Sequence, residues 1–115
     1  MTAGGISLHA VDVVSGQAAT GMRVAIRRIA PDDACVAEGI LGANGMLDHP
    51  VVGGEGMLAG IYVASFAIRD FYTPRGIPCP FLDSLDFRFV IEDPGPHVHL
   101  PLKFSPWGLA LFRGV

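Results

Sequence analysis

The sequence is poor in charged residues, in cysteine and in long apolar runs, and each shortage excludes a class of protein. Only 17% of its 115 residues are charged and the formal net charge is −3, which argues against a basic face for nucleic acid. No stretch approaches the ~20 apolar residues of a membrane-spanning helix. With two cysteines, the chain must rely on a packed core, without a framework of disulfides. We therefore expect a small-molecule or protein partner, no nucleic acid and no membrane.

The beginning of the chain lacks the basic region and the apolar stretch of a signal peptide. We therefore expect a cytoplasmic protein in which Cys35 and Cys79 are reduced. A length of 115 residues suits one domain covering residues 1–115, which can bury roughly two thirds of the surface of the unfolded chain. Half of the residues are hydrophobic and occur in short segments, so we expect part of them to be buried between subunits.

Turn-forming residues are abundant. Fifteen glycines and nine prolines cut the chain into short apolar segments, which favours an all-β sandwich over a helix bundle. The predicted strands cover residues 6–14, 22–27, 35–41, 51–52, 58–68, 87–91, 97–104 and 109–112. One short helix is predicted over residues 69–76, and Asn44-Gly45 predicts a tight turn.

Three of the four histidines, and one arginine near the end of the sequence, are candidates for a catalytic role. His97 and His99 lie two residues apart on a predicted strand and therefore share a face, which suits acid–base catalysis or metal binding. With His9 of the first predicted strand, they could also supply three zinc ligands and leave one position open for water. A strand histidine can equally be exposed or structural, and Arg113 can be a surface residue. His49 belongs to no motif and is predicted to be a solvated loop residue.

Several segments carry a family resemblance. Residues 97–115 resemble the C-terminal signature of the 5-hydroxyisourate hydrolases, the transthyretin-like enzymes of urate breakdown, which reads His-Tyr-His-Val-Pro-Leu-Leu-Leu-Ser-Pro-Tyr/Trp-Gly and closes on Tyr-Arg-Gly-Ser. Residues 8–16, 71–81 and 87–94 are similar to further motifs of the family. The resemblance implies a transthyretin-like sandwich of two four-stranded sheets with one short helix. It also implies a homotetramer, a dimer of dimers with its sites in clefts between the dimers.

The resemblance also implies a set of catalytic residues. His9 and His99 match the two histidines that assist a water molecule in attacking a ring carbonyl, without a required metal or cofactor. Arg113 matches the cation that stabilises the developing oxyanion. The resemblance also places His97 at the substrate site, where it would support the catalytic pair structurally.

The chain departs from the family at three positions where substrate would bind. An arginine that follows the Asn/Asp-Gly turn in the family is Met46 here, and the closing tyrosine and serine are Phe112 and Val115. A charge-assisted hydrogen bond contributes roughly 1.5 to 3 kcal/mol, so two such losses predict turnover of hydroxyisourate that is weaker by orders of magnitude. The alternative is that Phe112 and Val115 pack in a subunit interface and leave the chemistry to other residues.

Three functions follow from the sequence. The favoured one is a diverged, metal-free enzyme in which His9 and His99 act as acid and base on a small, less polar cyclic substrate, by hydrolysis, cyclisation, isomerisation or elimination. The second is 5-hydroxyisourate hydrolysis itself. The third is a non-catalytic ligand-binding protein, for which transthyretin is the precedent on the same fold. Retention of both histidines together with Arg113 favours an enzyme, although a fold alone does not decide function.

Overall fold

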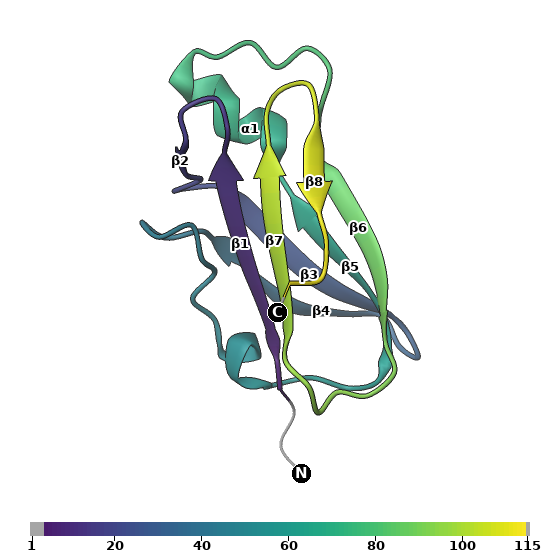
Figure 1. Cartoon of the computed structure of the whole chain (residues 1–115). Helices are drawn as coiled ribbons and strands as arrows, with labels where there is room; N and C mark the ends of the chain where they lie inside the picture. The colour runs from purple at the N-terminus through teal and green to yellow at the C-terminus, as the bar shows by residue number, and fades with distance from the viewer. Residues whose placement is uncertain (1–3, 115) are drawn as a thin grey trace.

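The computed structural model describes residues 4–114 and arranges them as two facing four-stranded sheets with one short α-helix, as predicted (Figure 1). The first sheet has the strand order β2-β1-β7-β8 and the second β4-β3-β5-β6. The strands are β1 (Ile6–Asp12), β2 (Gln17–Ala18), β3 (Arg23–Ala30), β4 (Ala34–Ile40), β5 (Gly60–Phe66), β6 (Leu85–Ile91), β7 (Val98–Phe104) and β8 (Leu109–Leu111). Helix α1 (Ile68–Tyr72) continues into a 3-10 turn, η2 (Thr73–Arg75), at one end of the sandwich. Among residues 4–114, none of the helices is long and apolar enough to cross a membrane.

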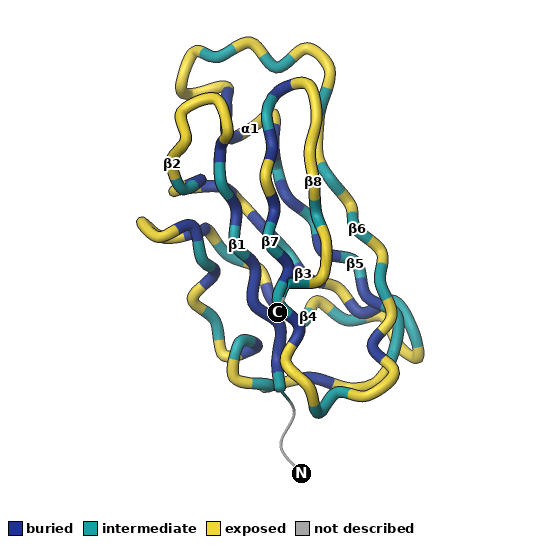
Figure 2. The backbone as a smooth tube through the Cα atoms, in the orientation of Figure 1, coloured by how far each residue is buried: buried dark blue, intermediate teal, exposed yellow. Residues whose placement is uncertain are grey.

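The core lies between the sheets and is built by alternate residues of each strand. Val24 and Ile26 of β3 are buried, and so are Tyr62, Ala64 and Phe66 of β5. Figure 2 shows the same alternation of buried and more exposed positions along β7. Because strand side chains alternate between two faces, the period of two in the sequence predicts the core positions of β3 correctly, whereas in β5 it points to Ile61 and Val63 and the structure buries the opposite face.

One predicted strand is wrong. Residues 51–52 belong to a 3-10 helix, η1 (Pro50–Gly53), although Val51 is fully buried. Pro50 opens the helix with a preset φ, Nδ1 of His49 accepts a hydrogen bond from the Val51 amide at 3.0 Å, and Gly54 closes it in the left-handed conformation with φ 99°. His49 is therefore a half-buried helix cap and not the solvated loop residue that the sequence predicted.

Helix α1 is attached to the first sheet through a buried pair. The hydroxyl of Tyr72 donates to Oδ1 of Asp12 at 2.5 Å, and Asp12 is 3% exposed. Burial acts to raise the pKa of Asp12, but hydrogen bonds from Tyr72, Ser15 and the backbone of Val14 and Ser15 outweigh it and leave the pKa lowered. The ionised carboxylate of Asp12 therefore has a structural role: it holds α1 against the end of β1.

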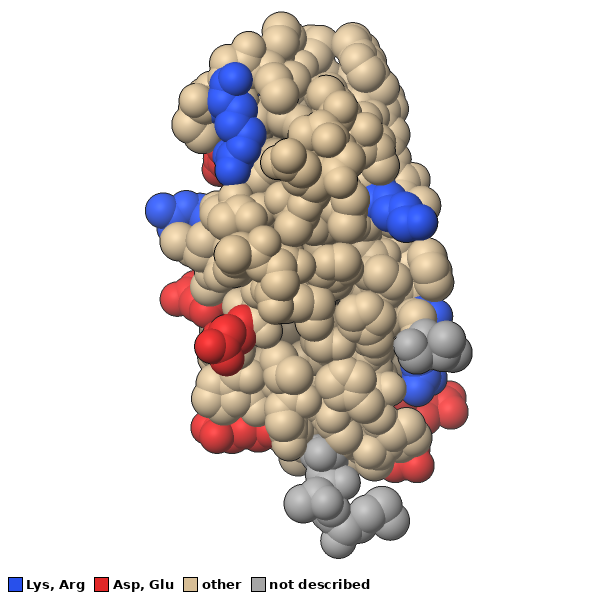
Figure 3. All heavy atoms as spheres, turned by 60° about the vertical axis from the view of Figure 1, so that its left-hand side comes forward, with Lys and Arg blue, Asp and Glu red and all other residues tan. Residues whose placement is uncertain are grey.

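A large part of the molecular surface is apolar and carries few charges. The exposed large hydrophobic residues are Val13, Val14, Ile40, Leu58, Phe81, Val90, Trp107, Leu109 and Phe112. Phe81 and Trp107, each 66% exposed, stack with their ring centroids 6.4 Å apart. In Figure 3, the charged side chains gather toward the edges of the visible face, and its centre carries none. A surface of this kind is typical of chains that cover part of it with a partner.

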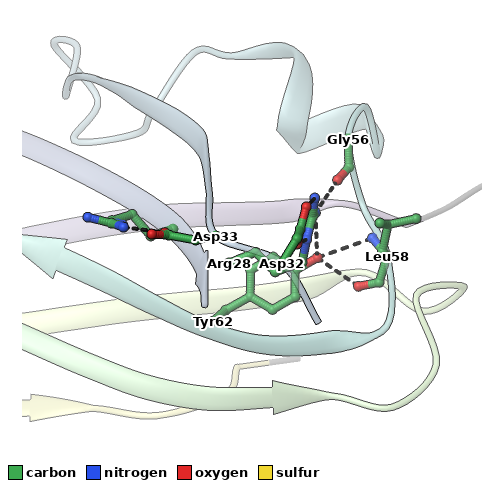
Figure 4. Close-up of polar contacts among 7 residues, drawn as sticks. Arg28, Asp32, Asp33, Gly56, Leu58 and Tyr62 are labelled. Atoms are coloured by element: carbon green, nitrogen blue, oxygen red, sulfur yellow. Dashed lines mark hydrogen bonds and ion pairs between the residues drawn. The ribbon is translucent and has the colours of Figure 1, made fainter. Parts of the chain in front are cut away.

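A buried arginine in the second sheet serves the fold. Arg28 is 7% exposed, and its guanidinium donates to both carboxylate oxygens of Asp32, at 2.6 and 3.0 Å, and to the Gly56 carbonyl at 2.8 Å. The hydroxyl of Tyr62 below it donates to the Leu58 carbonyl at 2.7 Å. Figure 4 shows these side chains converging between β3 and the segment that leads into β5. Because its donors are engaged within the fold, Arg28 stabilises this end of the sandwich.

Candidate active site

The pairing of β1 with β7 brings together the two histidines that the sequence nominates as catalytic. These strands run parallel, with Ser7 opposite His99 and His9 opposite Pro101. His9 and His99 both lie on the outer face of the first sheet, in neighbouring rows of side chains. Their ring centroids are 6.5 Å apart and their planes are 22° from parallel. The structure therefore places the predicted pair within reach of one small molecule.

The chain beyond β8 brings Arg113 to the edge of this face, where it borders the cavity of His99 and also a second cavity lined by Glu92 and Asp93. Gly114 pairs with His99 in an isolated β-bridge, and its amide donates to the His99 carbonyl at 2.7 Å. A Cβ at position 114 would lie 3.0 Å from Cδ2 of His99, so glycine is what allows this close approach. The result is an open cavity of about 650 Å³ lined by Ser7, His97, His99, Arg113 and Gly114.

Ser7 is the site residue that sequence reasoning missed. It is 4% exposed, and its Oγ lies 2.6 Å from Nδ1 of His99 and 2.9 Å from Nε2 of His97. Nδ1 of His97 in turn lies 2.5 Å from the carbonyl oxygen of Gly4. The available signal was the strand period, since Ser7 and His9 are polar residues two apart in an apolar strand.

His9 is held by the turn that the sequence predicted. The Gly45 amide bonds to the Gly42 carbonyl at 2.9 Å, and Gly45 has the positive φ of 74° that this turn requires. Nε2 of His9 donates to the Asn44 carbonyl at 3.1 Å, and Met46 pairs with His9 in an antiparallel bridge. The predicted substrate-binding position Met46 is therefore half-buried beside His9.

The remaining predicted residues fall at the margin of the site. The register of β8 on β7, with Leu111 opposite Leu102 and Gly114 opposite His99, places Phe112 across from Pro101 on the outer face. Phe112 is 53% exposed. Val115, the third predicted substrate-binding position, lies outside the described residues.

The electrostatic environment favours a neutral base next to a cation. Burial lowers the pKa of His99, and the neighbouring imidazoles of His9 and His97 lower it further. None of the residues that line the cavity is a carboxylate, and Arg113 has no ion pair or hydrogen bond within residues 4–114. In the same part of the chain, no three His, Cys, Asp or Glu side chains group in a way that could hold a metal ion. A neutral imidazole can accept a proton here, and Arg113 can stabilise an anion.

Comparison with known proteins gives the same family over nearly all of the described residues. The HIUase/Transthyretin family matches residues 6–114. A 5-hydroxyisourate hydrolase of Caulobacter vibrioides is 34% identical over 114 residues, which cover 96% of this chain and 97% of that protein.

Solved structures extend the similarity to the fold. An (S)-allantoin synthase superimposes with a TM-score of 0.91 at 30% identity, over 99% of this chain and 44% of that one, so the present chain corresponds to less than half of that protein. Sea bream transthyretin in complex with thyroxine superimposes with a TM-score of 0.84 at 22% identity, over 96% of this chain and 94% of that one. The chain therefore belongs to the HIUase/transthyretin family and has the transthyretin-like β-sandwich fold.

Proposed function

We propose that this chain is an enzyme that performs metal-free acid–base chemistry on a small cyclic substrate less polar than 5-hydroxyisourate. The observation that carries the proposal is the pair of His9 and His99, with ring centroids 6.5 Å apart, beside the cavity that Arg113 lines. His99 is the general base that activates water or removes a substrate proton. His9 is the general acid, and Arg113 stabilises the negative charge that develops on a carbonyl oxygen.

The case for a changed substrate comes from the side chains around the pair. Met46 is bridged to His9, so it meets the same part of a bound ring, and Phe112 lies on the same outer face. At both positions the resembling hydrolases have groups that donate hydrogen bonds. A polar substrate atom buried against these apolar side chains would lose about 1 to 3 kcal/mol of binding. A neutral ring with fewer polar atoms suits the site better.

Two other functions have their own support. The relatives named 5-hydroxyisourate hydrolase at about one third identity favour that hydrolysis as the second candidate. The likeness to a transthyretin that binds thyroxine makes a ligand carrier the third. We place the carrier last because binding alone requires neither a hydrogen-bonded imidazole with a lowered pKa nor a second imidazole stacked beside it.

A substrate comparison tests the proposal. Wild-type protein is given freshly generated 5-hydroxyisourate, whose ring opening is followed by ultraviolet absorbance, and a panel of neutral cyclic amides, imides and lactones. We expect weak turnover of hydroxyisourate and faster turnover of a neutral ring, unchanged by chelators. Turnover of hydroxyisourate at about 10 per second or more, a rate typical of efficient enzymes, would establish the second candidate instead. Tight binding of ring compounds with no turnover would establish the carrier.

We further propose that the active form is a homotetramer whose cavities are completed between subunits. The support is the apolar surface, including the exposed Phe81–Trp107 pair, and the open cavity around His99. Light scattering in dilute solution is expected to give about four times the 12.1 kDa mass of one chain. A stable monomer would contradict the shared cavity, because each subunit would then have to form the complete site alone.

A further inference from the structure

Four groups at the active-site cavity, three of which line it, are hydrogen-bonded in series. The series runs from the carbonyl of Gly4 to Nδ1 of His97, at 2.5 Å, and from Nε2 of His97 to Oγ of Ser7, at 2.9 Å. It continues from Oγ of Ser7 to Nδ1 of His99, at 2.6 Å. The last atom of the series is Nε2 of His99, which has no hydrogen-bond partner among residues 4–114.

The backbone carbonyl at the far end sets the direction of every bond in the series. A carbonyl oxygen only accepts, so Nδ1 of His97 must carry a proton. Nε2 of neutral His97 then has a lone pair and accepts the hydroxyl proton of Ser7. The Ser7 oxygen is left to accept, and Nδ1 of His99 donates to it. Neutral His99 therefore carries its lone pair on Nε2.

We infer that Ser7 and His97 are positioning residues that hold His99 in the tautomer with a basic Nε2. The inference deepens the proposed function and rests on it, since a general base must present a lone pair to the proton that it removes. Neither residue needs to touch the substrate for this role. His9 is outside the series because its Nε2 donates to the Asn44 carbonyl.

The basic nitrogen is accessible to solvent. Within residues 4–114, no buried side-chain nitrogen or oxygen lacks a hydrogen-bond partner. Nε2 of His99 lacks one, and His99 is only partly buried, so this atom must be accessible to solvent. The cavity that His99 lines also contains Arg113. A water molecule or a substrate proton can therefore reach Nε2 without displacing a protein group.

The anchor of the series is rigid. The Gly4 amide donates to the Pro94 carbonyl at 2.8 Å, and a Cβ at this position would lie 2.4 Å from the Gly95 carbonyl oxygen and from the His97 amide nitrogen. Ser7 is 4% exposed and sits directly opposite His99 in the β1–β7 ladder. Backbone pairing therefore fixes the donor and acceptor geometry before any ligand arrives.

The same hydrogen-bond directions are also compatible with His99 in its protonated form. When Nε2 of His99 takes a proton from water, one water O–H bond breaks, an N–H bond forms at Nε2, and hydroxide is left for the attack. Nδ1–H still donates to Ser7, and this bond becomes charge-assisted. No group in the series has to turn, so the stabilisation is present when the charge appears.

Nitrogen-15 NMR of the imidazole rings tests the inference without a substrate. Protein labelled at histidine is compared as wild type, Ser7→Ala and Ser7→Thr, with signals assigned by single histidine substitutions. We expect wild-type His99 to carry its proton on Nδ1, Ser7→Ala to show a mixture of both tautomers, and Ser7→Thr, which keeps a hydroxyl on a strand-compatible side chain, to restore the first state. His97→Gln, at an exposed position, should shift the same signals if Ser7→Ala does not fold.

Kinetics on the best substrate of the panel gives the second readout. Ser7→Ala is expected to lower kcat by about 10-fold or more with little change in KM, and Ser7→Thr is expected to recover it. A wild-type His99 protonated at Nε2, or a Ser7→Ala tautomer identical to wild type, would overturn the inference and leave the proposed function standing. If the tautomer responds as expected but the wild type turns over no ring compound, the proposed function fails and the positioning role is retained.

Discussion

Replacement of His99 by alanine is expected to reduce kcat/KM on the best substrate by about 10²- to 10⁴-fold, the range that a general base contributes. His9→Ala is expected to reduce it to a similar extent because the two rings, 6.5 Å apart, act on one substrate from neighbouring rows of the sheet. The double variant should lose little more than either single variant, since the pair works as a unit. Steady-state kinetics measures the losses, and circular dichroism checks that each variant is folded.

The matched control is His49→Asn. His49 caps the η1 helix, its ring nitrogen accepts from the Val51 amide, and it does not line the cavity of His99. Asparagine keeps an acceptor at this N-cap, so activity and stability should stay near those of the wild type. An equal loss in this control would mean that the effect of the other variants is not specific to the site.

The pH profile gives an independent check on the role of His99. Burial and the two neighbouring imidazoles lower its pKa from the ordinary 6.5. A base acts when it is unprotonated, so kcat/KM should rise with pH along an acidic limb whose midpoint lies below 6.5. Activity that instead tracks bound zinc and disappears with a chelator would replace the acid–base role by a three-histidine metal site.

The sequence alone predicts the architecture well because local chemistry decides it. Alternation of apolar and polar residues predicts which residues of β3 and β6 face the core, and Asn44-Gly45 predicts the turn beside His9. The failure at residues 51–52 has the opposite cause. Two apolar residues are too few to show a period. The flanking His49, Pro50 and Gly54 cap and begin a 3-10 helix instead.

The contacts around the catalytic histidines depend on strand pairing that cannot be predicted from local sequence. Ser7 and His99 are 92 positions apart and meet through the register of two parallel strands, which no local pattern specifies. A shift of that register by one residue would turn Ser7 away from His99. The bridge between Met46 and His9 is of the same kind. The motifs therefore nominate His9, His97, His99 and Arg113, whereas the structure supplies Ser7 and the order of the hydrogen bonds.

Restoring the family's polar groups is expected to raise 5-hydroxyisourate hydrolysis substantially. The variant combines Met46→Arg, Phe112→Tyr and Val115→Ser. An arginine at position 46 would extend from the bridge beside His9 toward an anionic ring, and a tyrosine at position 112 would place a hydroxyl on the outer face opposite Pro101. The serine is chosen on the resemblance alone. Each charge-assisted hydrogen bond contributes roughly 1.5 to 3 kcal/mol, or about 10-fold or more in rate when it forms only in the transition state.

The three substitutions are expected to act together. The rate increases of the three single variants, multiplied together, should therefore be smaller than the increase of the triple variant. A control variant with Met46→Gln in place of Met46→Arg supplies a shorter hydrogen-bonding side chain without charge, and should recover only a small part of the rate. Ultraviolet absorbance of freshly generated hydroxyisourate, corrected for the spontaneous rate, gives the comparison. If the triple variant were no faster than a slow wild type, the limiting difference from the hydrolases would lie elsewhere than at these three positions. If the wild type were already fast, Met46 and Phe112 would be compatible with the family's own reaction, and the altered substrate would have to be abandoned.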